Sequence, residues 1–310
     1  MSIDKIHKAF VSGKAVFFII LLGFIASRLY DANGDWDNPS LWGGTIIQIG
    51  IALLLLQLNH VFTIIRSRTL LPALFYLTFT ACSLPFTSDL TGSIAALCVV
   101  LSCFFLFHAY QEPESQIYAL NMGILLTLGS LLWPQLLFFF PVFWYGFYHF
   151  RSLNFRVFLA SITGIMAVYL FILAWSVYAE DWGVFLSFLP DFHELFSVQK
   201  PDFTLPEWII LCFTLLVYIF AGFNLFVSDL SEKIRTVSIL RYLYFSSFII
   251  FAPFLLQSEN KSHWTLIIFI PVALLFSHFF TLSNKKLVKY GMLICFFFFW
   301  GMYIRQHFPA

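Results

Sequence analysis

Charged residues are scarce in this chain. Only 11% of its 310 residues are Asp, Glu, Lys or Arg, whereas an ordinary soluble domain contains about 25%. Hydrophobic residues make up 60%, and apolar runs recur from residue 15 to residue 304 without a polar stretch large enough for a soluble domain. We therefore predict a single membrane-embedded domain over residues 1–310.

Other features that the chain lacks exclude several functions. The formal net charge of +1 gives no basic excess to attract nucleic acid. No apolar run carries a lone Asp, Glu or Lys near its middle, where pumps usually keep one. The cysteines form no C-x-x-C pair, so we interpret them as small buried hydrophobic residues and expect no metal and no cofactor: Cys82, Cys98, Cys103, Cys212 and Cys295.

Eleven apolar segments are present, and each is expected to be a helix. The predicted fold class is all-α, a polytopic transmembrane helical bundle of about 11 helices. Several segments are shorter than a full span, so tilting or local thinning of the bilayer would accommodate them. The segments are 15–30, 43–65, 70–84, 91–110, 118–132, 135–150, 156–178, 208–227, 239–256, 264–281 and 287–304.

The distribution of charge predicts the orientation of the bundle. Lys and Arg in short loops are retained in the cytoplasm during insertion. A cytoplasmic N-terminus and an outer C-terminus place 13 of the 17 basic residues inside and 11 of the 16 acidic residues outside. The first segment is too poor in small residues near its end for a cleavage site, so we expect it to be retained. We predict a multi-pass protein of the bacterial inner membrane.

The longest outer loop, residues 179–207, has apolar residues at helical spacing with acidic residues between them. This pattern predicts a helix lying in the outer interface, interrupted at Pro190. Asp191, His193 and Glu194 offer ligands for a divalent cation, although a water-exposed acidic loop contains such a triplet without binding metal.

From residue 107 to 174 the sequence resembles a family of integral membrane proteins of Bacteroidota whose domain has no known function. The shared features are Phe107-His108-x-Tyr110, Asn121 with Gly123, a Ser-Leu-x-x-Pro break over residues 130–134, and two arginines, 151 and 156, before Gly164. The family is expected to carry a proline soon after that glycine, where this chain has Met-Ala-Val at 166–168. The resemblance covers about a quarter of the chain and implies no particular activity.

A more distant resemblance, in outline only, is to membrane glycosyltransferases of the C-type fold. These proteins begin in the cytoplasm, carry a catalytic Asp or Glu in the first outer loop, and act on polyprenyl-linked sugars at the outer face. The resemblance implies that Asp35 or Asp37 is the catalytic base. The chain lacks the large soluble domain that many members append.

The first outer loop therefore supplies the main candidate site. A carboxylate there could accept a proton from a sugar hydroxyl, and Arg28 could bind a lipid phosphate. The alternative is a polar loop in which Arg28 reaches outward to water or pairs with Asp31. Lys261 and His263, before a later helix, could also bind phosphate, or form an ordinary polar cap.

Polar residues inside the second segment, Gln48, Gln57, Asn59 and His60, need partners within the membrane. Hydrogen bonds between helices explain them as well as a substrate path does. Three functions follow as hypotheses: a glycosyltransferase-like enzyme acting on polyprenyl-linked sugars, a non-catalytic membrane subunit or scaffold of an envelope or secretion complex, and a lipid or solute transporter. The expected partners are the lipid bilayer, a polyprenyl-phosphate lipid and other envelope membrane proteins.

Overall fold

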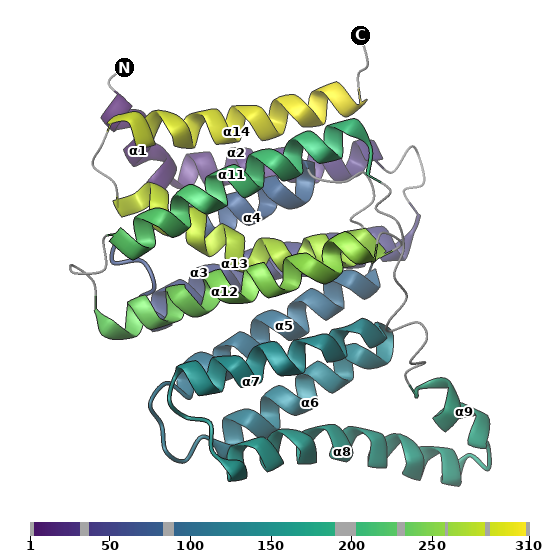
Figure 1. Cartoon of the computed structure of the whole chain (residues 1–310). Coiled ribbons are helices and arrows are strands. Elements are labelled where there is room, and N and C mark those ends of the chain that lie inside the picture. The colour runs from purple at the N-terminus through teal and green to yellow at the C-terminus, as the bar shows by residue number, and fades with distance from the viewer. Residues whose placement is uncertain are drawn as a thin grey trace. The chain divides into compact units, whose positions relative to one another are not determined.

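The computed structural model describes residues 3–31, 37–82, 90–189, 203–227, 233–257, 260–282 and 286–307. Within these ranges the chain forms thirteen α-helices and one short 3-10 helix, and no strand (Figure 1). The predicted all-α fold class is thus confirmed. The helices are α1 Ile3–Ser12, α2 Lys14–Asp31, α3 Pro39–Phe62, α4 Leu71–Cys82, α5 Leu90–His108, α6 Gln116–Leu132, η1 Pro134–Phe138, α7 Phe139–His149, α8 Phe155–Tyr178, α9 Trp182–Ser187, α11 Leu205–Val227, α12 Ile234–Leu256, α13 Lys261–Leu282 and α14 Lys286–His307.

Each of the eleven predicted segments is helical, and the ends differ by a few residues. In the described part of the chain, seven helices are long and apolar enough to cross a membrane: α3, α5, α8, α11, α12, α13 and α14. The pair α1 and α2, bent by 72° between them, could form an eighth span. These helices indicate a multi-pass membrane protein. The count of eleven spans stays a prediction, because α4, α6 and α7 are short.

Contacts divide the chain into two compact units. Unit 1 comprises Met1–Ser93 and Lys200–Ala310, and unit 2 comprises Ile94–Gln199, so the first turn of α5 belongs to unit 1. The prediction of a single membrane-embedded domain is not tested by this division. Each unit is described by itself below.

The core of unit 1 is α4, which is enclosed by α2, α3, α13 and α14 (Figure 1). All twelve of its side chains are buried. Phe75 stacks on Phe296 with ring centroids 4.7 Å apart, and Phe79 lies 4.7 Å from Phe299. A helix of twelve residues is only about 18 Å long, so it fits inside a bundle without having to cross the bilayer alone.

The helices of unit 1 place their basic termini together. Lys289 Nζ, at the start of α14, lies 2.8 Å from Asp4 Oδ1 in α1, and this hydrogen bond and the lysine charge hold the pKa of Asp4 below its usual value. At the start of α12, Thr236 Oγ1 donates to Thr63 O beyond the end of α3 at 3.4 Å. We call this the basic end of unit 1, defined by Lys14, Arg66, Arg68, Arg235 and Lys289.

Unit 2 is organised by the crossing of α6 and α8 (Figure 1). The crossing is close because glycines meet there: a Cβ added to Gly123 would lie 2.5 Å from Ser161 O, and one added to Gly164 would lie 2.5 Å from Leu120 O. Trp144 Nε1 of α7 donates to Ser161 Oγ at 2.9 Å. Small residues thus allow the two helix backbones to touch, as is common between membrane helices.

The structure differs from the sequence predictions in three places. Residues 3–12 form a helix, α1, that the apolar pattern did not predict. Of the expected interfacial helix, the described part is the six-residue α9, and Asp191, His193 and Glu194 lie outside the described residues. Cys212 is exposed, so the interpretation of all the cysteines as buried is wrong for that residue, while the other four are buried.

Candidate functional site

Arg28, near the end of α2, lies inside the bundle. Its side chain is only 1% exposed, and its guanidinium carbon lies 5.0 Å from the centre of the Phe24 ring. Arg28 Nη2 donates to Gln48 Oε1 at 3.1 Å and to Thr80 O at 2.9 Å. A buried guanidinium needs such acceptors to replace its lost water. The interpretation that Arg28 reaches outward to water is therefore wrong.

Gln48 extends this contact into a chain of polar side chains that joins three helices. Its Nε2 donates to Ser93 Oγ, in the first turn of α5, at 3.0 Å. Arg28, Gln48 and Ser93 thus connect α2, α3 and α5 within unit 1. The interhelical hydrogen bonding expected for Gln48 is confirmed, whereas Gln57 and His60 are exposed. Asn59 bonds to the loop after its own helix, accepting from Ile65 N at 2.8 Å.

The two carboxylates proposed as the base fall in different situations. Asp35 lies within 32–36, outside the described residues, and the side chain of Asp31 is likewise not described. Asp37 is exposed and precedes Asn38, whose Oδ1 caps α3 by accepting from Ser40 N at 3.1 Å. A negative charge before a helix start is favourable by itself. Arg28 is buried and Asp37 is exposed, so the two side chains lie in different surroundings.

Lys261, at the start of α13, forms a salt bridge with Glu207 of α11. Lys261 Nζ lies 3.1 Å from Glu207 Oε1 and 3.2 Å from Oε2. Glu207 is only 7% exposed, and its Oε2 also accepts from Thr204 N at 2.7 Å. Thr204 and Glu207 occupy the N-cap and N3 positions of a capping box, T-x-x-E. That signal was present in the sequence and could have identified Glu207, which sequence analysis did not single out.

His263 points to a different neighbour. Its ring lies against Gly92 in the first turn of α5, where an added Cβ would be 2.2 Å from His263 Cδ2. Residues two apart on a helix face different directions, so Lys261 contacts α11 while His263 contacts α5. The structure therefore separates the two residues that were grouped as one phosphate site.

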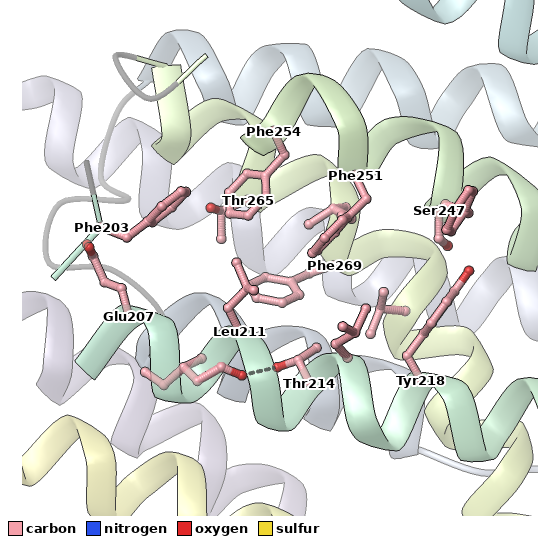
Figure 2. A pocket seen from close by; sticks show the side chains of 15 residues that line it. Phe203, Glu207, Leu211, Thr214, Tyr218, Ser247, Phe251, Phe254, Thr265 and Phe269 are labelled. Atoms are coloured by element: carbon pink, nitrogen blue, oxygen red, sulfur yellow. Dashed lines mark hydrogen bonds between the residues drawn. The ribbon is translucent and has the colours of Figure 1, made fainter. Parts of the chain in front are cut away.

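A cavity of about 70 Å³ opens beside Glu207, between α11, α12 and α13 (Figure 2). Glu207 lies at one end of it, and Tyr218 and Ser247 lie at the other (Figure 2). The wall between them is formed mainly by aromatic and aliphatic side chains: Phe203, Ile210, Leu211, Leu215, Phe248, Phe251, Phe254, Ile268, Phe269 and Val272.

The few polar groups along this cavity are hydrogen-bonded to the protein. Thr214 Oγ1 donates to Ile210 O at 2.8 Å, and the Tyr218 hydroxyl donates to the carbonyl of Tyr244. The space is several times the roughly 15 Å³ that one water needs, but water also needs polar partners. A hydrocarbon chain therefore suits the cavity better than water does.

In the part of the chain that the structure describes, no three His, Cys, Asp or Glu side chains gather as metal ligands would. Comparison of the chain with protein-family models, curated proteins and solved structures finds no match. The function is therefore argued from the geometry of this chain alone.

Proposed function

We propose that this multi-pass protein of the bacterial inner membrane binds a long-chain lipid with an anionic head group, such as a polyprenyl phosphate. The observation that supports the proposal is the apolar cavity between α11, α12 and α13, with Glu207 at one end (Figure 2). Glu207 forms a salt bridge with Lys261. The aromatic and aliphatic wall suits the hydrocarbon tail. Lys261, which is 29% exposed, would contact the head group.

The reaction that we propose at this site is transfer of a sugar from a polyprenyl carrier at the outer face, by a glycosyltransferase-like enzyme. Asp35 or Asp37 would accept the proton of the acceptor hydroxyl as a general base. The outline resemblance to C-type glycosyltransferases supports this assignment. Arg28 would maintain the arrangement of α2, α3 and α4, because its hydrogen bonds go to the protein.

Blocking the cavity tests the lipid proposal. Leu211→Trp fills the cavity from α11, whereas Leu216→Trp, on the same helix and 52% exposed, leaves it open. Purified full-length protein in nanodiscs is irradiated with a photoreactive polyprenyl phosphate, and the labelled peptide is quantified by mass spectrometry. We expect Leu211→Trp to reduce labelling of α11–α13 roughly tenfold, because a tryptophan occupies the space of the tail. Leu216→Trp is expected to label as the unchanged protein does.

Monodisperse elution and an unchanged unfolding temperature show that both variants are folded. If both folded variants label equally well, the cavity does not bind the lipid tail. Co-purification of another envelope membrane protein would then favour the non-catalytic subunit, and lipid or solute movement across the bilayer without covalent change would favour the transporter.

A further inference from the structure

A second hollow, of about 650 Å³, opens at the basic end of unit 1. It lies between the start of α2, the end of α3 and the connection at residues 63–70. Among the described residues that line it, the charged side chains are all cationic: Lys14, Arg66 and Arg68. His60 also lines it. We call it the basic pocket. None of its residues belongs to the cavity between α11, α12 and α13.

Hydrogen bonds fix the wall of the basic pocket. Asn59, which is 5% exposed, accepts from Ile65 N at 2.8 Å and so holds the connection against the last turn of α3. Leu70 N donates to Val11 O at 2.9 Å, which ties the other side of the connection to α1. The arginines therefore project from a backbone whose position is set before any ligand binds, and this lowers the entropy lost on binding.

The wall also contains a backbone conformation that residues other than glycine rarely adopt. Thr63, which ends α3, has φ 49° and lies in the left-handed region. Its carbonyl accepts the hydroxyl of Thr236 from α12 at 3.4 Å. At the far side, Thr69 Oγ1 accepts from Leu71 N at 3.1 Å and begins α4. Three other helices, α1, α4 and α12, thus position the arginines after α3.

The cations of the basic pocket are available to a ligand. Lys14, Arg66 and Arg68 are exposed, and none of them forms an ion pair within the described part of the chain. The retention of basic residues in the cytoplasm explains why these three cations lie at the same end of unit 1. It does not explain why they line the same hollow. Three cationic side chains around one space repel one another unless an anion lies between them.

We propose that the basic pocket binds a phosphate-bearing anionic ligand on the side predicted to be cytoplasmic. Two guanidinium groups present planar pairs of donors that match phosphate oxygens. A volume of about 650 Å³ accommodates more than one phosphate group. The phosphate could belong to an anionic lipid head group, since basic pockets between membrane helices bind such groups, or to a soluble phosphate compound. The experiment distinguishes these sources.

The test uses full-length protein in nanodiscs. One arm compares phosphatidylcholine alone with phosphatidylcholine containing phosphatidylglycerol, and counts retained phosphatidylglycerol by native mass spectrometry. The other arm titrates inorganic pyrophosphate into the phosphatidylcholine nanodiscs and measures the rise in unfolding temperature. Binding in the first arm alone assigns the ligand to the lipid, and binding in the second arm alone assigns it to a soluble phosphate. Either outcome supports the pocket.

Two variants remove the pocket in different ways. The triple variant Lys14→Gln, Arg66→Gln, Arg68→Gln removes its charge, and each cation is expected to contribute roughly fivefold, giving about a hundredfold weaker binding. Ser67→Trp places a bulky side chain in the hollow but keeps every charge, so it tests the pocket even if the triple variant inserts poorly. The control Arg151→Gln, Arg156→Gln, Lys233→Gln removes three exposed cations from outside the pocket. It is expected to change affinity less than twofold.

The proposal is overturned if Ser67→Trp and the triple variant both bind as the unchanged protein does. It is also overturned if the control loses as much affinity as the triple variant, because general surface charge would then explain the binding. Leu211→Trp, which blocks the other cavity, is expected to leave binding at the basic pocket unchanged. The two proposals can therefore fail independently.

Discussion

At the scale of single residues, burial changes what a charged side chain can do. Polar sequence follows Arg28 and precedes Lys261, and both residues are predicted to lie near the outer surface. Arg28 is only 1% exposed and bonds across α2, α3 and α4, whereas the Lys261 side chain is 29% exposed and reaches a carboxylate. The first arrangement suits a structural contact, and the second suits a group that can also meet a ligand.

Replacing Arg28 by alanine tests that distinction. The change leaves Gln48 Oε1 and Thr80 O without the donor that they share. We expect the free energy of unfolding to fall by about 1–3 kcal/mol, since buried acceptors lose their partner. The measurement is reversible unfolding in mixed detergent micelles, with Arg156→Ala, at an exposed position of α8, as the matched control.

This view of Arg28 would be contradicted if Arg28→Ala lost activity but unfolded as Arg156→Ala does. The guanidinium would then act on a ligand instead.

Glu207 has one partner that is near in the sequence and one that is distant. Its capping-box partner, Thr204, is three residues away, but its cation, Lys261, is 54 residues away.

At the scale of elements, close helix packing depends on where small residues meet. Gly123 and Gly164 lie on different helices, so no G-x-x-x-G motif in the sequence predicts their contact. Phe107 and Tyr110 also pack on Phe150 in this part of the chain, with ring centroids 6.0 and 5.5 Å apart. These features therefore support packing within unit 2.

Alanine at either glycine is expected to separate α6 from α8. A new Cβ would lie 2.5 Å from a backbone oxygen in both cases, and backbone cannot move aside as a flexible side chain can. We expect Gly123→Ala and Gly164→Ala each to lower the free energy of unfolding by about 1–3 kcal/mol. Thermal unfolding in detergent measures the change.

Gly50→Ala and Gly301→Ala are the controls for this pair. Both positions are helical, and an added Cβ would meet nothing within 4 Å. Since alanine is the better helix former by about 1 kcal/mol, these variants should be neutral or slightly more stable. Equal destabilisation at all four glycines would mean that the crossing of α6 and α8 is not specially close.

At the scale of the whole molecule, the distribution of charge predicts the sidedness of the protein. In unit 1, Asp37 stands before α3, and Ser67 lies in the basic pocket after it. Both are exposed. The excess of Lys and Arg near Ser67 predicts that this end stays in the cytoplasm, while Asp37 is outside.

Cysteine labelling tests the sidedness. In a variant without the five native cysteines, Asp37→Cys should react with a membrane-impermeant maleimide added to intact cells. Ser67→Cys should react only after the membrane is opened. Labelling of both positions in intact cells would exclude the predicted orientation of α3.

The sequence by itself determined the class of the protein and the position of its helices. In lipid every backbone N–H and C=O must be hydrogen-bonded within the protein, and a helix satisfies this requirement within one long apolar segment. All eleven predicted segments are helical for this reason. The polar α1 was missed because only ten residues form it, with four charged or histidine side chains among the first six.

The tertiary structure decided which side chains meet. Helices that are apolar on every face give little indication of how each is rotated or how deep it lies. Thr80 as the acceptor for Arg28, Glu207 as the partner of Lys261, and the separation of Lys261 from His263 therefore emerge only from packing. The same holds for the two candidate ligand sites. Each is lined by residues from segments far apart in the chain, which only the folded bundle brings together.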